Sequence, residues 1–303
     1  MSDSQVVLPA KGKSILFVSL TLGGGTKVAT DDLARLLKKE GQSVFMLATK
    51  DNLIWELSSH ITNATAQFDI RTERNEFIAF LKELDVWHVH YHHVLEFGKS
   101  VWDLPNELGC EYDVTLHDYF TVCPRVNFLT ADDTFCGMPD ENGCRKCLNK
   151  VNVHDASFLQ LKDVGGDITQ WREYFHEKLS AARKVITPSN DTKERIEHFI
   201  PLKNISALYH PEEVEEVAIK PRNRAIDEPV TIGFIGAIGP HKGLNIIKSL
   251  AQEIQDNGLN INLAIIGYTS DDQYFSQFDF VSISGAYKKT DLKVLMAAAK
   301  IDV

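Results

Sequence analysis

Short uninterrupted runs of apolar residues alternate along this chain with longer segments whose apolar residues recur at every third or fourth position. The first run is Ser14–Leu20, and Val28–Glu40 follows it with apolar side chains at helical spacing. A strand buried on both faces of a parallel sheet reads as continuous apolar sequence, whereas a helix packed on that sheet shows the longer period. The alternation therefore predicts βαβ units and a parallel sheet.

The same alternation continues to the end of the chain and is interrupted once. The interruption is a charged stretch, 212–229, which carries Pro221 and Pro229 and indicates a linker. Before the linker we expect strands at 43–48, 85–90, 110–116 and 184–187 and a helix at 75–84. After it we expect strands at 230–236, 260–267 and 280–284 and helices at 244–255 and 291–300.

These elements predict an α/β fold with two Rossmann-like domains. Residues 1–13 form a polar tail, residues 14–211 a complete first domain and residues 230–303 a partial second domain. A doubly wound domain covers both faces of its sheet, and three strands with a stub are too few to complete one. Because Ile301–Val303 resemble the start of a further strand, we expect a chain that is truncated at its C-terminus.

Composition narrows the function classes. The chain has 303 residues, 44% of them hydrophobic, and a net charge of −10, which argues against a nucleic-acid partner because phosphate backbones require excess Lys and Arg. No apolar run approaches the roughly 20 residues of a membrane-spanning helix, and the N-terminus lacks an apolar signal segment. We therefore expect a cytoplasmic protein that does not bind nucleic acid.

Two glycine-bearing turns each join a predicted strand to a predicted helix. Their glycines and one lysine are Gly23, Gly24, Gly25, Gly236, Gly239, Lys242 and Gly243. Glycines let backbone amides approach a phosphate closely, and a helix N-terminus favours negative charge. Lys242 adds an ammonium group to the second turn. The first turn does not fit the dinucleotide fingerprint G-x-G-x-x-G, and its alternative is a tight turn that needs positive φ. The alternative for the second turn is an exposed lysine in a turn.

Histidines and an aspartate follow two of the predicted strands. His117 and Asp118 come at the end of the strand 110–116, and His92 and His93 follow the strand 85–90. The carboxyl ends of parallel strands face the crevice in which doubly wound proteins bind ligands, and an imidazole can donate to a sugar hydroxyl. We expect His92 or His93 to touch an acceptor and Asp118 to orient its neighbour, although structural histidines give the same pattern.

The order of these motifs resembles that of family 4 glycosyltransferases, which are retaining nucleotide-sugar enzymes of the GT-B architecture. The motifs in that order are Gly23–Gly25, Thr115–Asp118, Val185–Ser189 and Gly236–Gly243. The resemblance runs from about Ser14 to the end and includes His117–Pro124 with the cysteine-rich loop that follows. It implies transfer of a sugar from a nucleoside diphosphate donor to a glycan or lipid-linked acceptor in polysaccharide biosynthesis.

The resemblance also implies roles for individual residues. Gly23–Gly25 would lie beneath the transferred sugar and its diphosphate, and His117 would contact the donor sugar as the catalytic residue. Lys242 and the backbone of the second turn would neutralise the leaving diphosphate, and Tyr268 would lie near the nucleotide base. No catalytic metal is expected, because cationic side chains and helix ends take that task.

Two departures from the family pattern bear on activity. Ala237 stands where many members have an arginine, and the Glu-x7-Glu segment expected after Ile301 is absent. We therefore expect this chain to be an inactive fragment of a glycosyltransferase, with a non-catalytic sugar- or glycan-binding remnant as the alternative. A GT-B epimerase ranks lower, since its histidine and carboxylate pattern is not visible. Peripheral membrane association of the parent protein and the oligomeric state stay open.

Four of the five cysteines lie in a polar, turn-rich loop, 123–147. They are Cys123, Cys136, Cys144 and Cys147. Such a loop has little apolar material to order it, and tetrahedral thiolate ligation of a metal would supply that order. The sequence therefore favours a structural zinc site as a hypothesis, with buried free thiols as the alternative.

Overall fold

The computed structural model describes residues 13–21, 24–60, 62, 64–210 and 223–303. The chain forms two compact units, one built mainly from residues 1–128 and 136–214 and the other mainly from residues 215–303. Residues 211–222 lie outside the described residues, so most of the predicted linker 212–229 does too.

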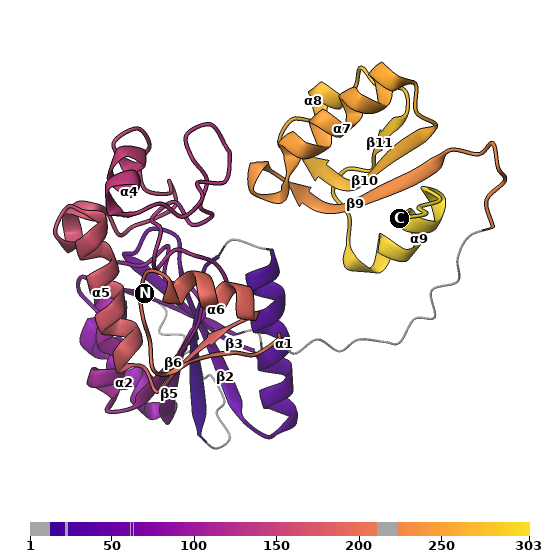
Figure 1. Ribbon diagram of the computed structural model, residues 1–303. Helices are drawn as coiled ribbons and strands as arrows, with labels where there is room; N and C mark the ends of the chain where they lie inside the picture. The colour runs from indigo at the N-terminus through magenta and orange to yellow at the C-terminus, as the bar shows by residue number, and fades with distance from the viewer. Residues whose placement is uncertain (1–12, 22–23, 61, 63, 211–222) are drawn as a thin grey trace. The chain divides into compact units, whose positions relative to one another are not determined.

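The first unit is built on an eight-stranded sheet in the order β4-β3-β2-β1-β5-β6-β7-β8. Figure 1 labels β2, β3, β5 and β6 of this sheet. Its strands are β1 (Ser14–Val18), β2 (Ser43–Thr49), β3 (Ile54–Ser59), β4 (Thr65–Asp69), β5 (Val86–Tyr91), β6 (Glu111–Thr115), β7 (Lys184–Thr187) and β8 (Ile205–Ala207). Its helices are α1 (Gly25–Lys39), α2 (Arg74–Glu83), α3 (Leu104–Leu108), α4 (Glu141–Leu148), α5 (Ile168–Ala181) and α6 (Asn190–Glu197), with short 3-10 turns at Lys99–Asp103 and Leu161–Val164.

Burial on both faces explains why β1 reads as a continuous apolar run. All five of its residues are buried. Phe17 packs with Ala34 of α1 on one face, whereas Leu16 and Val18 belong to the large core that includes Phe77 of α2. Helices thus cover both faces of a sheet whose central strands run parallel, as the sequence pattern predicts.

The sheet also contains an antiparallel part that the sequence pattern does not predict. β3 pairs antiparallel with β2, and β4 pairs antiparallel with β3. Trp55 of β3 is fully buried and meets Phe77 edge to face at 5.5 Å. The β3–β4 hairpin thus extends the predicted parallel sheet without a crossover helix, and the whole sheet is mixed.

The second unit contains a three-stranded parallel sheet in the order β11-β10-β9 (Figure 1). Its elements are β9 (Val230–Ile238), α7 (Leu244–Asn257), β10 (Ile261–Thr269), α8 (Asp272–Phe275), β11 (Val281–Ile283) and α9 (Leu292–Ala298), with 3-10 turns at Pro240–Lys242 and Lys289–Asp291. Leu244, Ile247, Ala251 and Ile254 recur at helical spacing and form the buried side of α7. They pack with Leu263 and Ile265 of the sheet.

The last three residues run beside β9. Gly233 N donates to Val303 O at 2.8 Å, and Asp302 N donates to Thr231 O at 2.9 Å. A Cβ atom on Gly233 would lie 2.6 Å from Cδ1 of Ile301, so the glycine leaves room for that side chain. The segment has the position expected of a further strand, although it forms no regular strand itself.

None of the helices within the described residues is both long enough and apolar enough to cross a lipid bilayer.

Candidate functional site

Polar side chains form three cross-strand pairs on one face of β5 and β6, which we call the polar ladder. The ladder consists of His88 with Asp113, His90 with Thr115 and His92 with His117. Each partner comes 25 residues after its histidine. In the parallel pairing His88 is aligned with Glu111 and His90 with Asp113, so these two histidines contact the residue two positions further along, diagonally across the strands. Phe17 of β1 packs against it, with ring centroids 5.4 Å from His90 and 4.6 Å from His92.

The first two pairs of the ladder are buried. Nε2 of His88 lies 3.2 Å from Oδ2 of Asp113, and Nε2 of His90 lies 2.8 Å from Oγ1 of Thr115. Burial lowers the pKa of His90 to about 4, so its imidazole is neutral at neutral pH. Burial alone would raise the pKa of Asp113, but its contacts with His88 and Arg183 hold that pKa well below the usual range.

The third pair lies at the carboxyl edge of the sheet, where His117 follows β6. Nδ1 of His92 lies 3.2 Å from Nε2 of His117. The rings of His117 and His210 are stacked, with centroids 5.0 Å apart. Burial, followed by the nearby His210, lowers the pKa of His117 to about 3, and burial lowers the pKa of His92 well below its usual value. Both imidazoles are therefore neutral at neutral pH.

His93 and Asp118 are hydrogen-bonded to each other. Leu95 N donates to Nδ1 of His93 at 3.1 Å, so Nδ1 is unprotonated and Nε2 carries the proton. This Nε2 donates to Oδ2 of Asp118 at 2.7 Å, and Phe120 N donates to Oδ1 at 2.9 Å. Burial would raise the pKa of Asp118, yet these contacts, His93 above all, lower it. Asp118 thus orients His93 and not its sequence neighbour His117, which pairs with His92.

A small cavity lies at the same carboxyl edge, with a volume of about 20 Å³. Its polar lining residues are His92, His93, Thr115, His117, Asp118 and Thr121. A space of this size holds about one water molecule. The structure therefore gathers the four polar residues predicted from the ends of β5 and β6 around one site.

The glycine-rich turn before α1 lies at the carboxyl end of β1. Gly24 has φ +99°, and Gly25 begins α1, while Gly23 lies outside the described residues. Side chains with a Cβ rarely adopt such a φ, so the turn requires glycine at position 24. The first turn of α1 carries no acidic residue.

Glu96 anchors this turn and was not predicted from the sequence. Its Oε2 accepts from Thr21 N at 2.6 Å, and its Oε1 accepts from Thr21 Oγ1 at 2.8 Å. The Glu96 carboxyl lies in an apolar run with Leu95 and Phe97, and only 6% of the residue is exposed. An acidic residue inside a buried apolar run was the signal that could have identified it.

The second unit carries the other glycine-bearing turn. Gly236 has φ +120° near the end of β9, and Gly239 and Gly243 flank the 3-10 turn Pro240–Lys242 that leads into α7. Lys242 is exposed. Gly236 pairs with Gly267 of β10, and a Cβ on Gly267 would lie 2.1 Å from the Gly236 carbonyl oxygen.

Tyr268, which was predicted to lie near a nucleotide base, directly follows Gly267 in β10. It is 47% exposed. Its ring is thus accessible at the same end of the second sheet as the glycine-bearing turn, since Tyr268 pairs with Ala237.

The four thiols of the loop 123–147 are free and half-buried. Within the described residues, which include all four, no three His, Cys, Asp or Glu side chains gather in a way that could hold a metal ion. The zinc hypothesis for Cys123, Cys136, Cys144 and Cys147 therefore has no support in the structure.

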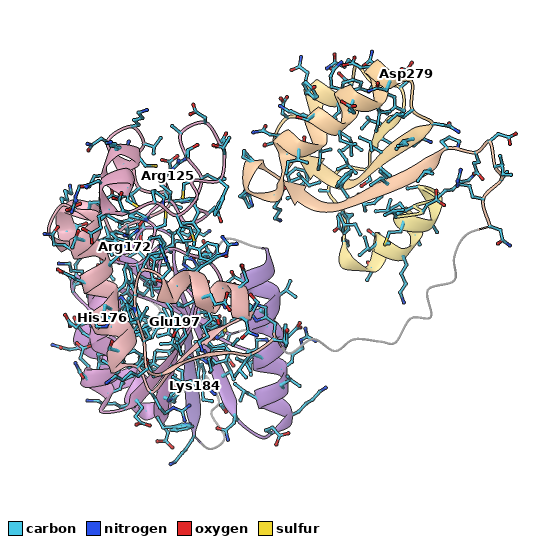
Figure 2. All side chains as sticks on the ribbon, in the orientation of Figure 1. Arg125, Arg172, His176, Lys184, Glu197 and Asp279 are labelled. Atoms are coloured by element: carbon cyan, nitrogen blue, oxygen red, sulfur yellow. The ribbon has the colours of Figure 1, made fainter. Side chains whose placement is uncertain are left out.

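Helix α5 orders this loop instead. Nε1 of Trp171 donates to Phe120 O at 3.0 Å, and Nε of Arg172 donates to Val122 O at 3.1 Å. Figure 2 labels Arg172. Its Nη2 lies 3.2 Å from Sγ of Cys144, and its guanidinium lies 3.9 Å from the centroid of the Phe199 ring.

Comparison with protein families and with curated proteins finds no match. Solved structures do match. The lipopolysaccharide outer core galactosyltransferase WaaB is 15% identical with TM-score 0.53, and the match covers 95% of this chain and 72% of that one. Sucrose-phosphate synthase from Thermosynechococcus elongatus is 15% identical with TM-score 0.55, over 95% of this chain and 74% of that one. A glycosyltransferase from Rickettsia africae is 12% identical with TM-score 0.51, over 93% and 70%.

These similarities define the fold class. The chain has the α/β fold of GT-B glycosyltransferases, with a large mixed sheet in the first unit and a small parallel sheet in the second. At these identities the likeness shows the fold alone.

Proposed function

We propose that this chain belongs to a retaining glycosyltransferase that moves a sugar from a nucleoside diphosphate donor to a hydroxyl of a glycan or lipid-linked acceptor. The observation that carries the proposal is the buried, neutral imidazole of His117 at the carboxyl edge of the first sheet. In doubly wound folds this edge is where ligands bind. The turn that contains Gly24 follows β1 at the same edge.

The proposed roles follow the chemistry of each residue. His117 contacts the donor sugar, with His92, His93 and Asp118 near the acceptor. The amides around Gly23, Gly24 and Gly25 approach the sugar and its diphosphate. In the second unit Gly236, Gly239, Gly243 and Lys242 bind the leaving diphosphate, and Tyr268 lies against the base. No metal is required, because an ammonium group and helix ends stabilise the charge that develops on the leaving group.

Titration of nucleoside diphosphates and nucleotide-sugars by calorimetry tests this proposal. We expect one of them to bind, and Lys242→Ala to weaken that binding by about tenfold or more, equivalent to about 1.4 kcal/mol. Lys288→Ala is the matched control, because Lys288 is another exposed lysine of the second unit. Absence of binding by every nucleotide, or equal loss in both variants, would contradict the proposal. Binding of a glycan without any nucleotide would favour a non-catalytic binding protein.

A further inference from the structure

The hydrogen bond between His92 and His117 restricts where each ring can carry its proton. Nδ1 of His92 lies 3.2 Å from Nε2 of His117, and both imidazoles are neutral at neutral pH. A neutral imidazole has one protonated and one bare nitrogen. The pair therefore has two consistent arrangements. Either His92 donates from Nδ1 and His117 carries its proton on Nδ1, or His117 donates from Nε2 and His92 carries its proton on Nε2.

Burial distinguishes the two arrangements. Nε2 of His92 and Nδ1 of His117 are both buried and lack a partner within the described residues. Whichever of these atoms carries the second proton is an unsatisfied donor, and buried unsatisfied donors are rarer and costlier than acceptors with a spare lone pair. His92 is 3% exposed, whereas His117 is less completely buried and follows β6 at the edge of the sheet. An N–H without a partner therefore costs less free energy at Nδ1 of His117 than at Nε2 of His92.

Ring stacking hinders rotation of the His92 and His117 side chains. The His92 ring lies between His90 at 4.2 Å and His117 at 5.5 Å, measured between centroids. His117 is stacked in turn on His210 at 5.0 Å. Rotation of either ring would disturb these contacts within a densely packed face. The hydrogen bond and the stack together define one orientation of the His117 ring.

We propose that His92 is a positioning residue, which donates from Nδ1 to Nε2 of His117 and thereby keeps the proton of His117 on Nδ1. Nε2 of His117 accepts the hydrogen bond from His92. The Nδ1–H of His117 is buried and lacks a partner within the described residues, so it can donate only to an oxygen atom that enters beside it. That this oxygen belongs to a bound sugar donor rests on the proposed function; the proton assignment does not. His117 then acts on its ligand as a hydrogen-bond donor and not as a base.

Nitrogen-15 NMR of the histidine-labelled full chain tests the proton assignment without any ligand. The chain has 11 histidines, and His117→Gln identifies the signals of His117 by their loss. We expect Nδ1 of His117 to have the shift of a protonated imidazole nitrogen and Nε2 that of a bare one at neutral pH. The reverse pattern in the wild-type protein overturns the proposal. The assignment requires a folded His117→Gln, and His117→Asn serves the same purpose if that variant does not fold.

Two substitutions of His92 test the positioning role. His92→Leu removes the hydrogen bond, so we expect the single proton pattern of His117 to become a mixture. His92→Asn keeps a side-chain amide donor near the position of Nδ1, so we expect it to restore the wild-type pattern. An unchanged pattern in His92→Leu, or a failure of His92→Asn to differ from it, would show that the remaining structure fixes His117 without His92.

A ligand measurement separates this inference from the proposed function. If a sugar donor binds, we expect His92→Leu to reduce donor affinity by about 10- to 100-fold, the range found when the partner that orients a metal-binding histidine is removed. His92→Asn should recover most of that loss. If no donor binds, the proposed function fails while the NMR result stands. If a donor binds but His92→Leu leaves the donor affinity unchanged, the positioning role fails alone.

Discussion

Substitution of Gly267 by alanine gives a sharp test of the second unit, because the structure supplies a matched control on the neighbouring strand. Gly267 has φ +131° and Gly236 has φ +120°, and the two residues pair across β10 and β9. A Cβ on Gly267 would lie 2.1 Å from the carbonyl oxygen and 2.8 Å from the carbonyl carbon of Gly236. A Cβ on Gly236 would meet nothing within 4 Å.

The two variants therefore differ by one physical effect. Both introduce a side chain at positive φ, which costs about 1–3 kcal/mol. Only Gly267→Ala also forces a contact on backbone atoms, and overpacking of this kind costs about 1–3 kcal/mol more. We expect Gly267→Ala to destabilise the β9–β10 pair by about 2–6 kcal/mol and Gly236→Ala by about 1–3 kcal/mol.

Hydrogen exchange of the β9 and β10 amides, followed by mass spectrometry, measures this difference locally. Tryptophan fluorescence would not, because all four tryptophans lie in the first unit. We expect Gly267→Ala to speed exchange in 261–269 well beyond the effect of Gly236→Ala. Equal exchange in the two variants would refute the argument from close backbone approach.

Two further predictions concern the first unit. Because burial lowers the pKa of His90 from 6.5 to about 4, the unfolded chain binds a proton between these values that the folded chain does not. The contribution of His90 to the free energy of unfolding is complete above pH 6.5 and falls by about 1.4 kcal/mol per pH unit as the pH drops toward 4. In urea unfolding followed by tryptophan fluorescence, the free energy of unfolding of His90→Asn should therefore depend less steeply on pH than that of the wild-type protein. Equal pH dependence in the two proteins would contradict this. Glu96→Gln replaces one of the two carboxylate oxygens that accept from Thr21 by an amide donor. We expect faster hydrogen exchange at the Thr21 amide with little change in β5. Unchanged exchange at Thr21 would show that Glu96 does not hold the turn.

The strands were predictable where burial on both faces leaves a continuous apolar run. Ser14–Leu20 and Val230–Gly236 correspond to β1 and β9 for this reason. The β3–β4 hairpin was not predictable in the same way, since β4 at the sheet edge is only partly buried and mixes polar with apolar residues. Edge strands carry a weaker pattern than central ones, and the antiparallel turn has no strong glycine signal.

The candidate site was predictable in its residues but not in its pairings. Alternation along the strand indicates that His88, His90 and His92 share a face, and the structure has this arrangement. Their partners come from another strand, and the alignment of two parallel strands depends on packing that no local pattern contains. The hydrogen-bonded pairs Asp118–His93 and His117–His92 therefore could not be predicted from the sequence.

The polar ladder has a consequence for how the chain selects its native strand pairing. Side chains alternate between the two faces of a strand, so displacement of β5 by one residue would turn every imidazole toward the apolar core that holds Val89 and Tyr91. Each ring would then be buried away from its hydrogen-bonding partner, at a cost of about 1–3 kcal/mol apiece. A purely apolar strand would carry no such penalty. The ladder thus excludes shifted alignments at the centre of the sheet and favours a single folded arrangement.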